Sequence, residues 1–304
     1  MLLVTFAVIA DYLNPSYSCL VRRAFLLILV LACDACRSAK PAATVTQIAA
    51  DNSVSVTDVR FYSDSISGLL WYRVIVPQSV PPARLSVLYL LHGINSGPEE
   101  ILTRSAVAKL AGMHRLIVVI PDAGFSYYVN AKHRWHSSWE DAITRELMAD
   151  VKMRFPVLEG REHTGIAGIS MGGYGAITLA LKHPKLYGFV GAMSGPFDIT
   201  RRSASLRRWG QTWRIWTIFG LRPSARRDED VFDLLRNSRG VPNSRWFDSC
   251  GRSDPLLAVN RRFVKQLRES GMNVEALETR GGHDWQSWNE GMPELFASAE
   301  QALR

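Results

Sequence analysis

The sequence predicts an α/β fold in which helices cover both faces of a mostly parallel sheet. Continuous apolar runs, typical of strands buried on both faces of such a sheet, recur at 85–91, 116–120, 164–169, 189–194 and 246–250. Helix-like stretches lie between or after them, at 98–113, 138–155, 171–183 and 255–271. A repeated order of strand, helix and strand implies parallel strands with helices packed on the sheet.

Two earlier segments have a different pattern. Residues 54–60 and 69–77 alternate apolar and polar side chains, as half-buried antiparallel strands do, so we expect them at an edge of the sheet. The 304 residues suit one large α/β domain. A composition of 47% hydrophobic and 21% charged residues argues against both a disordered chain and a multi-span membrane protein.

The N-terminal segment has the features of an export signal. Two arginines at 22–23 precede an apolar run at 24–32, and a short segment at 33–36 supplies the processing site. The run is too short to cross a bilayer comfortably. Another apolar segment, at 1–10, stands before the arginines, which favours a translation start near Val21. We therefore expect three parts: an export leader at 1–37, a tether at 38–51 and a folded domain at 52–304.

Cys33 gives this leader a second interpretation. Residues 30–33 resemble a bacterial lipoprotein processing box with Cys33 as the lipidated residue, although the leucine at position 31 fits that box poorly. We expect an exported protein, either secreted, periplasmic or envelope-associated, with a lipid anchor at Cys33 as the alternative to full release. Cys250 is the only cysteine of the domain, so the sequence predicts a buried thiol and no disulfide framework.

The charge does not point to a nucleic-acid partner. The net charge is +8, but the arginines are spread along the chain and no nucleic-acid motif accompanies them. We interpret the charge as surface character that favours anionic envelopes. Peripheral or lipid-anchored membrane association therefore fits the sequence.

The segment from Gly168 to Gly172, Gly-Ile-Ser-Met-Gly, has the G-x-S-x-G pattern of a nucleophile elbow. A strand turning sharply into a helix crowds the residues beside the serine, so those positions must lack side chains. An apolar strand precedes the motif and a helix rich in small residues follows it. We therefore predict that Ser170 is a nucleophile in an α/β-hydrolase fold.

The serine needs a base and an orienting acid, and in this fold the three follow in the order Ser, Asp, His. Asp254 lies in the loop directly after the strand that ends at Cys250, which is the expected position of the acid. Asp248 is the competing candidate but lies within that strand. His283 follows a strand-like segment near the C-terminus, so the predicted catalytic triad is Ser170, Asp254 and His283.

The loop after residues 85–91 is the expected place for half of an oxyanion hole. We expect the backbone N–H groups of Ile94 and Met171 to hold the developing oxyanion, with a rate contribution of about 10²–10³-fold per donor. We assign His92 the structural task of bracing this loop.

Residues 196–239, here called the cap insertion, interrupt the alternation of strands and helices, and we expect them to form a small helical cap. Because this segment lies between the nucleophile and the acid, we expect Trp213 and Trp216 to form an apolar wall over Ser170. The alternative is a surface helix whose aromatic side chains pack on the body of the domain. Trp285, close to His283, is a further candidate substrate contact.

These segments together resemble the esterase D family of α/β hydrolases, which includes S-formylglutathione hydrolases, feruloyl and acetyl-xylan esterases, short-chain acyl esterases and mycolyltransferases. The similarity runs from about Val54 to the C-terminus. It depends on seven further segments that occur in the family's order, at 90–93, 117–122, 128–130, 139–140, 146–147, 250–254 and 281–288. The cap insertion departs from the family pattern.

The resemblance implies a serine esterase that works through an acyl-enzyme intermediate, without a metal or an organic cofactor. The implied substrate is a small-molecule or carbohydrate-linked ester, including thioesters. An acyltransferase that passes the acyl group to a sugar or another alcohol is the first alternative, because its first half-reaction is identical. The second is an exported binding protein in which the site is idle.

Overall fold

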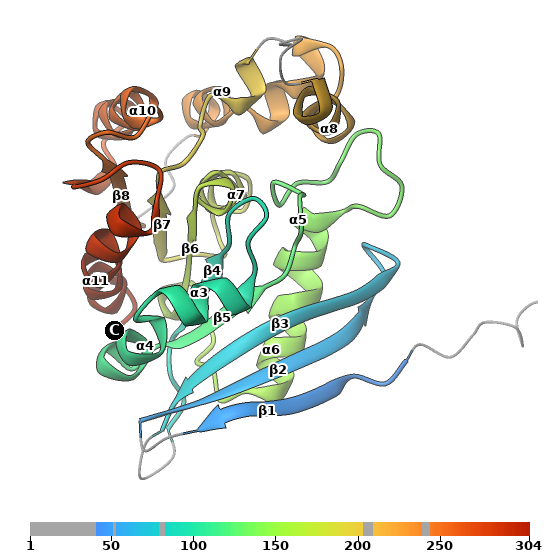
Figure 1. Cartoon of the computed structure of the whole chain (residues 1–304), viewed down its shortest axis with the longest axis vertical. Coiled ribbons are helices and arrows are strands. Elements are labelled where there is room, and N and C mark those ends of the chain that lie inside the picture. Colours follow the sequence, from blue (N-terminus) through green and yellow to red (C-terminus); the bar gives the residue numbers. More distant parts are fainter. Residues whose placement is uncertain (1–40, 51–52, 79–82, 203–208, 239–243) are drawn as a thin grey trace, which may run out of the picture. The chain divides into compact units, whose positions relative to one another are not determined.

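The computed structural model describes residues 41–304 except 51–52, 79–82, 203–208 and 239–243. The predicted export leader and Cys33 lie outside these residues. The described strands form one sheet in the order β1-β2-β3-β5-β4-β6-β7-β8-β9 (Figure 1). Its antiparallel edge consists of β1 (Thr44–Ala50), β2 (Val54–Ser63) and β3 (Gly68–Pro77). The parallel part consists of β4 (Val87–Leu91), β5 (Ile117–Pro121), β6 (Thr164–Ile169), β7 (Phe189–Met193), β8 (Arg245–Gly251) and β9 (Asn273–Thr279).

Both faces of the central parallel strands, from β5 to β8, are buried, which explains their continuous apolar runs. In β4, Val87, Tyr89 and Leu91 join the apolar cluster on one face, and Leu88 and Leu90 join the cluster on the other. The first face is covered by α6 (Met148–Arg154), α7 (Met171–Lys182), α9 (Val231–Asn237) and α10 (Leu257–Glu269) (Figure 1). The second is covered by α3 (Pro98–Arg104), α4 (Val107–His114) and α11 (Trp285–Ala302). The predicted α/β-hydrolase architecture is confirmed.

Three elements differ from the expected ones. Residues 44–50, expected to be part of the tether, form β1 and pair with β2, because the β-branched residues at 44–46 favour an edge strand. The expected helix at 98–113 is divided into α3 and α4 at Ser105, whose backbone is extended. The expected helix at 138–155 consists of α5 (Trp139–Asp141), a π-helical segment η1 (Ala142–Leu147) and α6.

The cap insertion is helical where the structure describes it. It contains η3 (Ile199–Arg201), α8 (Trp209–Phe219), η5 (Pro223–Glu229) and α9. Its last helix, α9, packs on α7 of the body. Within the described residues no helix is both long and apolar enough to cross a bilayer.

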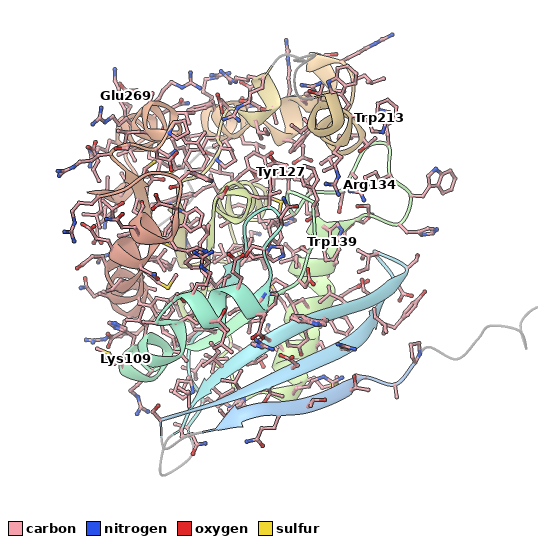
Figure 2. All side chains as sticks on the ribbon, viewed as in Figure 1. Lys109, Tyr127, Arg134, Trp139, Trp213 and Glu269 are labelled. Atoms are coloured by element: carbon pink, nitrogen blue, oxygen red, sulfur yellow. The ribbon has the colours of Figure 1, made fainter. Side chains whose placement is uncertain are left out.

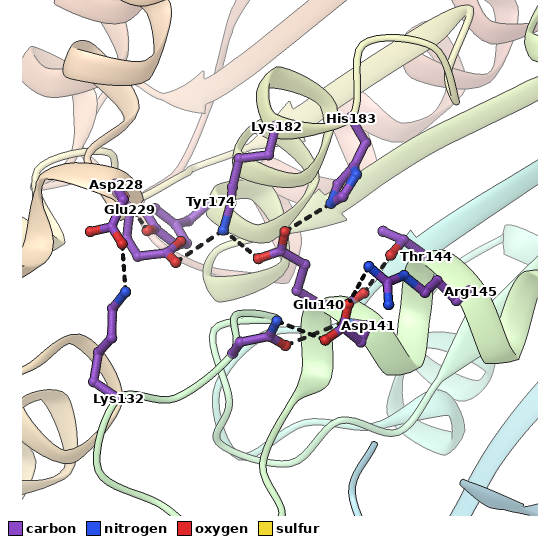
Figure 3. A network of polar contacts seen from close by, with 11 residues as sticks. Lys132, Glu140, Asp141, Thr144, Arg145, Tyr174, Lys182, His183, Asp228 and Glu229 are labelled. Carbon is purple, nitrogen blue, oxygen red and sulfur yellow. Dashed lines mark hydrogen bonds and ion pairs between the residues drawn. The ribbon is translucent and has the colours of Figure 1, made fainter. Parts of the chain in front are cut away.

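A buried polar network fastens the cap insertion to the body (Figure 3). Lys182 of α7 forms ion pairs with Glu140 of α5 and, at 3.0 Å, with Glu229 of η5. The Tyr174 hydroxyl donates to the Glu229 backbone carbonyl. Only 3% of the Glu229 side chain is exposed, and this burial raises its pKa to about 7 even though Lys182 acts in the opposite direction. One lysine therefore compensates two largely buried carboxylates from different parts of the chain.

Candidate active site

Ser170 lies in a strained turn between β6 and α7, with φ 54° and ψ −113°. The turn is possible because its flanking glycines leave room. A Cβ on Gly168 would lie 2.3 Å from the backbone of Gly172, and a Cβ on Gly172 would lie 2.1 Å from the Leu91 carbonyl oxygen. A positive φ at a residue with a side chain costs about 1–3 kcal/mol. In this strained conformation Ser170 lines a cavity.

The three predicted side chains lie in hydrogen-bonding contact. His283 Nε2 is 2.8 Å from the Ser170 hydroxyl, and His283 Nδ1 is 2.9 Å from a carboxylate oxygen of Asp254. The Asp254 side chain is fully buried, and burial alone would raise its pKa. Hydrogen bonds from His283 and from the Leu256 N–H hold that pKa below its ordinary value instead. The ionised carboxylate fixes the proton on Nδ1, which leaves Nε2 free to accept the serine proton.

Asp248, the competing candidate for the acid, does not contact His283. It is buried within β8, and burial raises its pKa well above the ordinary value. One of its carboxylate oxygens has no hydrogen-bond partner among the described residues. Cys250, at the end of the same strand, is a buried free thiol, as predicted. Of the two candidate acids, the structure therefore brings only Asp254 to the histidine.

Two residues behind the triad were missed by sequence reasoning. The ring of Trp288 meets that of His283 edge to face, with the centroids 5.3 Å apart, and its indole N–H donates to the Ser194 hydroxyl at 3.2 Å. Ser194 is fully buried with φ 56° and helps to lower the pKa of Asp254. Trp288 and Ser194 thus connect the base to the acid. No local sequence pattern predicts that Ser194, just after β7, and Trp288, in α11, contact each other.

The loop after β4 is oriented by His92, which is fully buried. The Ala123 N–H donates to His92 Nε2 at 3.0 Å, so the ring proton lies on Nδ1, which donates to the Gly93 carbonyl oxygen at 2.7 Å. In a planar trans peptide the N–H points opposite to the carbonyl. The Ile94 N–H therefore points away from the His92 ring, and Ile94 itself lines the cavity beside Ser170.

Met171 supplies the second N–H group that we expect in the oxyanion hole. It is the first residue of α7, where a backbone N–H has no acceptor within the helix. The partial positive charge at a helix N-terminus also favours an anion at this position. Ile94 therefore lines the same cavity as Ser170, and Met171 directly follows Ser170 at the start of α7.

The cavity in front of the serine has a volume of about 750 Å³. Trp285 lines it, together with His283 and Trp288. The described part of the cap insertion contributes Pro196, Ile199, Arg202, Thr212 and Ile215 to the lining.

Trp213 and Trp216 are absent from the described lining of this cavity, and the Trp213 side chain is 57% exposed. Helical geometry accounts for Trp213, which is one residue from Thr212 and two from Ile215 and so lies off the face of α8 that these two residues share. Trp216, four residues after Thr212, is close to that face and is partly buried. The apolar wall expected from the two tryptophans is instead supplied by Ile199 and Ile215.

The site thus has a strained serine, a histidine oriented by a buried carboxylate, and two N–H groups beside the serine. This is the arrangement of a serine hydrolase on an α/β-hydrolase fold. In the part of the chain that the structure describes, no group of three or more His, Cys, Asp or Glu side chains could hold a metal ion.

Comparison with known proteins identifies the family. Residues 64–298 match the family described as "Putative esterase", and the chain belongs to this family of ester-hydrolysing enzymes. The chain is 26% identical over 259 residues to an acetyl esterase of Caldicellulosiruptor saccharolyticus, which covers 80% of this chain and 97% of that protein. The predicted resemblance to esterase D proteins is confirmed at the level of the family.

Solved structures show the same fold. FphF, a fluorophosphonate-binding serine hydrolase of Staphylococcus aureus, aligns with a TM-score of 0.72 and 23% identity over 82% of this chain and 99% of that chain. An S-formylglutathione hydrolase from Agrobacterium tumefaciens aligns with a TM-score of 0.74 and 18% identity over 85% of this chain and 99% of that one.

Proposed function

We propose that this protein is a serine esterase that hydrolyses carboxylic esters through an acyl-enzyme intermediate on Ser170. The observation that carries the proposal is the continuous hydrogen-bonded chain from Ser170 through His283 to Asp254 at the wall of a cavity. The strain at Ser170 also argues against an idle binding protein, because such strain persists where function uses it.

In the first half-reaction His283 Nε2 takes the hydroxyl proton while the Ser170 oxygen attacks the ester carbonyl. The N–H groups of Ile94 and Met171 receive the oxyanion of the tetrahedral intermediate. The imidazolium, stabilised by Asp254, then returns the proton to the departing alcohol or thiol. The products of this step are the acyl enzyme and the free leaving group.

In the second half-reaction a water molecule attacks the acyl enzyme as His283 removes its proton, and Ser170 leaves with that proton as the acid departs. The His283 side chain is one-third exposed, so water can reach its ring. Such access is what the hydrolytic second half-reaction requires. The substrate class also draws support from relatives named acetyl esterase and ferulic acid esterase, and a 750 Å³ cavity exceeds what an acetyl group alone would fill.

The test combines a fluorophosphonate probe with 4-nitrophenyl esters of increasing acyl length. The native protein should be labelled and should release nitrophenolate, whereas Ser170→Ala should do neither and should melt within a few degrees of the native protein. Ser96→Ala is the matched control, because Ser96 lines the same cavity and its variant should still be labelled. Labelling or turnover by Ser170→Ala equal to that of the native protein would refute the proposal.

A further inference from the structure

Three arginines lie around Phe125 and Tyr127, two aromatic residues of the cavity lining, and two of the three stand at the rim, outside the lining itself. Arg202 lines the cavity itself. The Arg214 guanidinium carbon lies 4.5 Å from the centre of the Phe125 ring, and Arg134 donates to the Phe125 backbone carbonyl at 3.0 Å. Arg202 is close enough to Tyr127 to act against the rise that burial causes in the pKa of that tyrosine, so all three arginines neighbour this pair of aromatic residues.

Two segments far apart in the sequence create this cluster. The loop that carries Arg134 is attached to the end of α8, because the Lys132 N–H donates to the Ile218 carbonyl at 2.8 Å and the His133 N–H donates to the Thr217 carbonyl at 2.9 Å. Arg214 belongs to α8 itself. Figure 2 shows Arg134 and Tyr127 in the region of α8, whereas Lys109 lies well away from it on α4.

The cluster carries uncompensated positive charge. Arg202 has a carboxylate partner, Asp198, at 2.8 Å. Arg134 and Arg214 are exposed, and among the described residues neither forms an ion pair. Glu100 is the carboxylate among the described lining residues. It accepts hydrogen bonds from Arg104 at 3.1 Å and from the Trp285 indole at 3.0 Å, and so already has partners.

We infer that the wall at Phe125 binds an anionic group, a carboxylate or a phosphate, carried by the ester substrate. A guanidinium group binds such oxygens through a planar pair of N–H donors, and here two of them have no carboxylate of their own. The stacking of Arg214 on Phe125 and the bond from Arg134 hold the donors in place before substrate arrives. The inference rests on the proposed esterase function and specifies its substrate class.

The experiment uses two matched pairs of esters, because the anionic group can belong to either side of the scissile bond. The acyl-side pair is mono-4-nitrophenyl glutarate and its methyl ester, 4-nitrophenyl methyl glutarate. The alcohol-side pair is 4-acetoxybenzoate and its methyl ester. Within each pair the acyl and alcohol skeletons are the same and the members differ in one negative charge. Because the carboxylate also changes the intrinsic reactivity of the ester, each kcat/KM is divided by the rate constant of uncatalysed hydrolysis of the same ester. The measured quantity is the ratio of kcat/KM for the anionic member to kcat/KM for the neutral member.

For the native protein we expect a ratio of roughly three to ten in one pair at low salt, carried by a lower KM, since a partly exposed ion pair contributes modestly. The pair that shows it identifies the side that carries the charge. Salt at 0.5 M should bring the ratio towards one through screening. The double variant Arg134→Gln with Arg214→Gln should abolish the preference, and the corresponding double lysine variant should keep most of it.

Lys109→Gln is the matched control, because it removes one positive charge on α4 and should leave the ratio unchanged. A native ratio of one in both pairs, a ratio that survives the double glutamine variant, or an equal loss in Lys109→Gln would each overturn the inference. Turnover of the neutral esters together with fluorophosphonate labelling would in those cases leave the esterase function standing. Absence of both would refute the esterase function itself.

Discussion

The catalytic centre and the cap insertion are held in place by different kinds of interaction. At the centre, backbone geometry decides the positions, because only glycine fits at 168 and 172 and these two residues permit the tight turn in which Ser170 lies. The cap insertion is held by contacts between distant segments instead. They include the ion pairs of Lys182 with Glu140 and Glu229, which lie 42 and 47 residues away in the sequence, and the backbone hydrogen bonds from residues 132–133 to the end of α8. Local constraints leave a readable sequence motif, whereas long-range ion pairs do not.

The largest expected effect concerns the centre, where two aspartates of the same strand region differ in role. Asp254→Asn should lower kcat by about four orders of magnitude, as removal of the carboxylate that fixes the histidine tautomer does in other triads. Asp248→Asn should change kcat by less than about tenfold. Steady-state kinetics with a 4-nitrophenyl ester, together with far-UV circular dichroism as a check on folding, measure both. A greater loss of kcat in a folded Asp248→Asn protein would show that the acid is wrongly assigned.

The next effect concerns the attachment of the cap insertion. Lys182→Met leaves Glu140 and Glu229 buried without their shared cation, which should reduce the free energy of unfolding by about 3 kcal/mol at pH 8. The loss should be smaller at pH 5, because Glu229, with a pKa of about 7, then takes up a proton. Urea denaturation at the two pH values measures both losses.

Lys185→Met, an exposed lysine just after α7, is the control and should change stability by less than about 0.5 kcal/mol. Fluorophosphonate labelling of Ser170 should survive in Lys182→Met, since the elbow does not depend on the network. A loss of labelling in a folded Lys182→Met protein would mean that the two regions are coupled.

The sequence was enough to predict the catalytic residues but not the orientation of the cap insertion. The G-x-S-x-G motif, the loop with Asp254 and the glycine-flanked His283 each follow a strand, and the carboxyl ends of parallel strands meet at one edge of the sheet. The sequence predicted that the cap insertion is helical and rich in aromatic residues. It could not show which face of α8 meets the cavity, because α8 carries apolar side chains on more than one face. The role of Ser194 was equally hidden, since it follows from tertiary contact alone.

A smaller effect distinguishes Asp248 from Asp254 by the pH dependence of stability instead of by activity. Burial raises the pKa of Asp248 well above its unfolded value, so the folded protein holds a proton that the unfolded chain releases above about pH 4. This residue's contribution is therefore favourable below that pH and is lost as the pH rises. Asp248→Asn, which cannot ionise, should become more stable relative to the native protein as the pH rises from 5 to 8. Thermal denaturation across this range would contradict the assignment if the difference between the two proteins stayed constant.

The smallest effect tests which face of α8 meets substrate. Ile215 lines the cavity, whereas Trp213 lies outside the described lining with 57% of its side chain exposed. Ile215→Ala should therefore raise KM for a medium-chain 4-nitrophenyl ester by roughly fivefold, because it removes apolar surface that contacts the substrate, with kcat little changed. Trp213→Ala should leave KM within about twofold and the unfolding free energy within about 0.5 kcal/mol, as exposed substitutions usually do. The reverse pattern, with KM sensitive to Trp213 and indifferent to Ile215, would mean that α8 turns its aromatic face to the substrate during turnover, and that the wall expected from the sequence is the one used in catalysis.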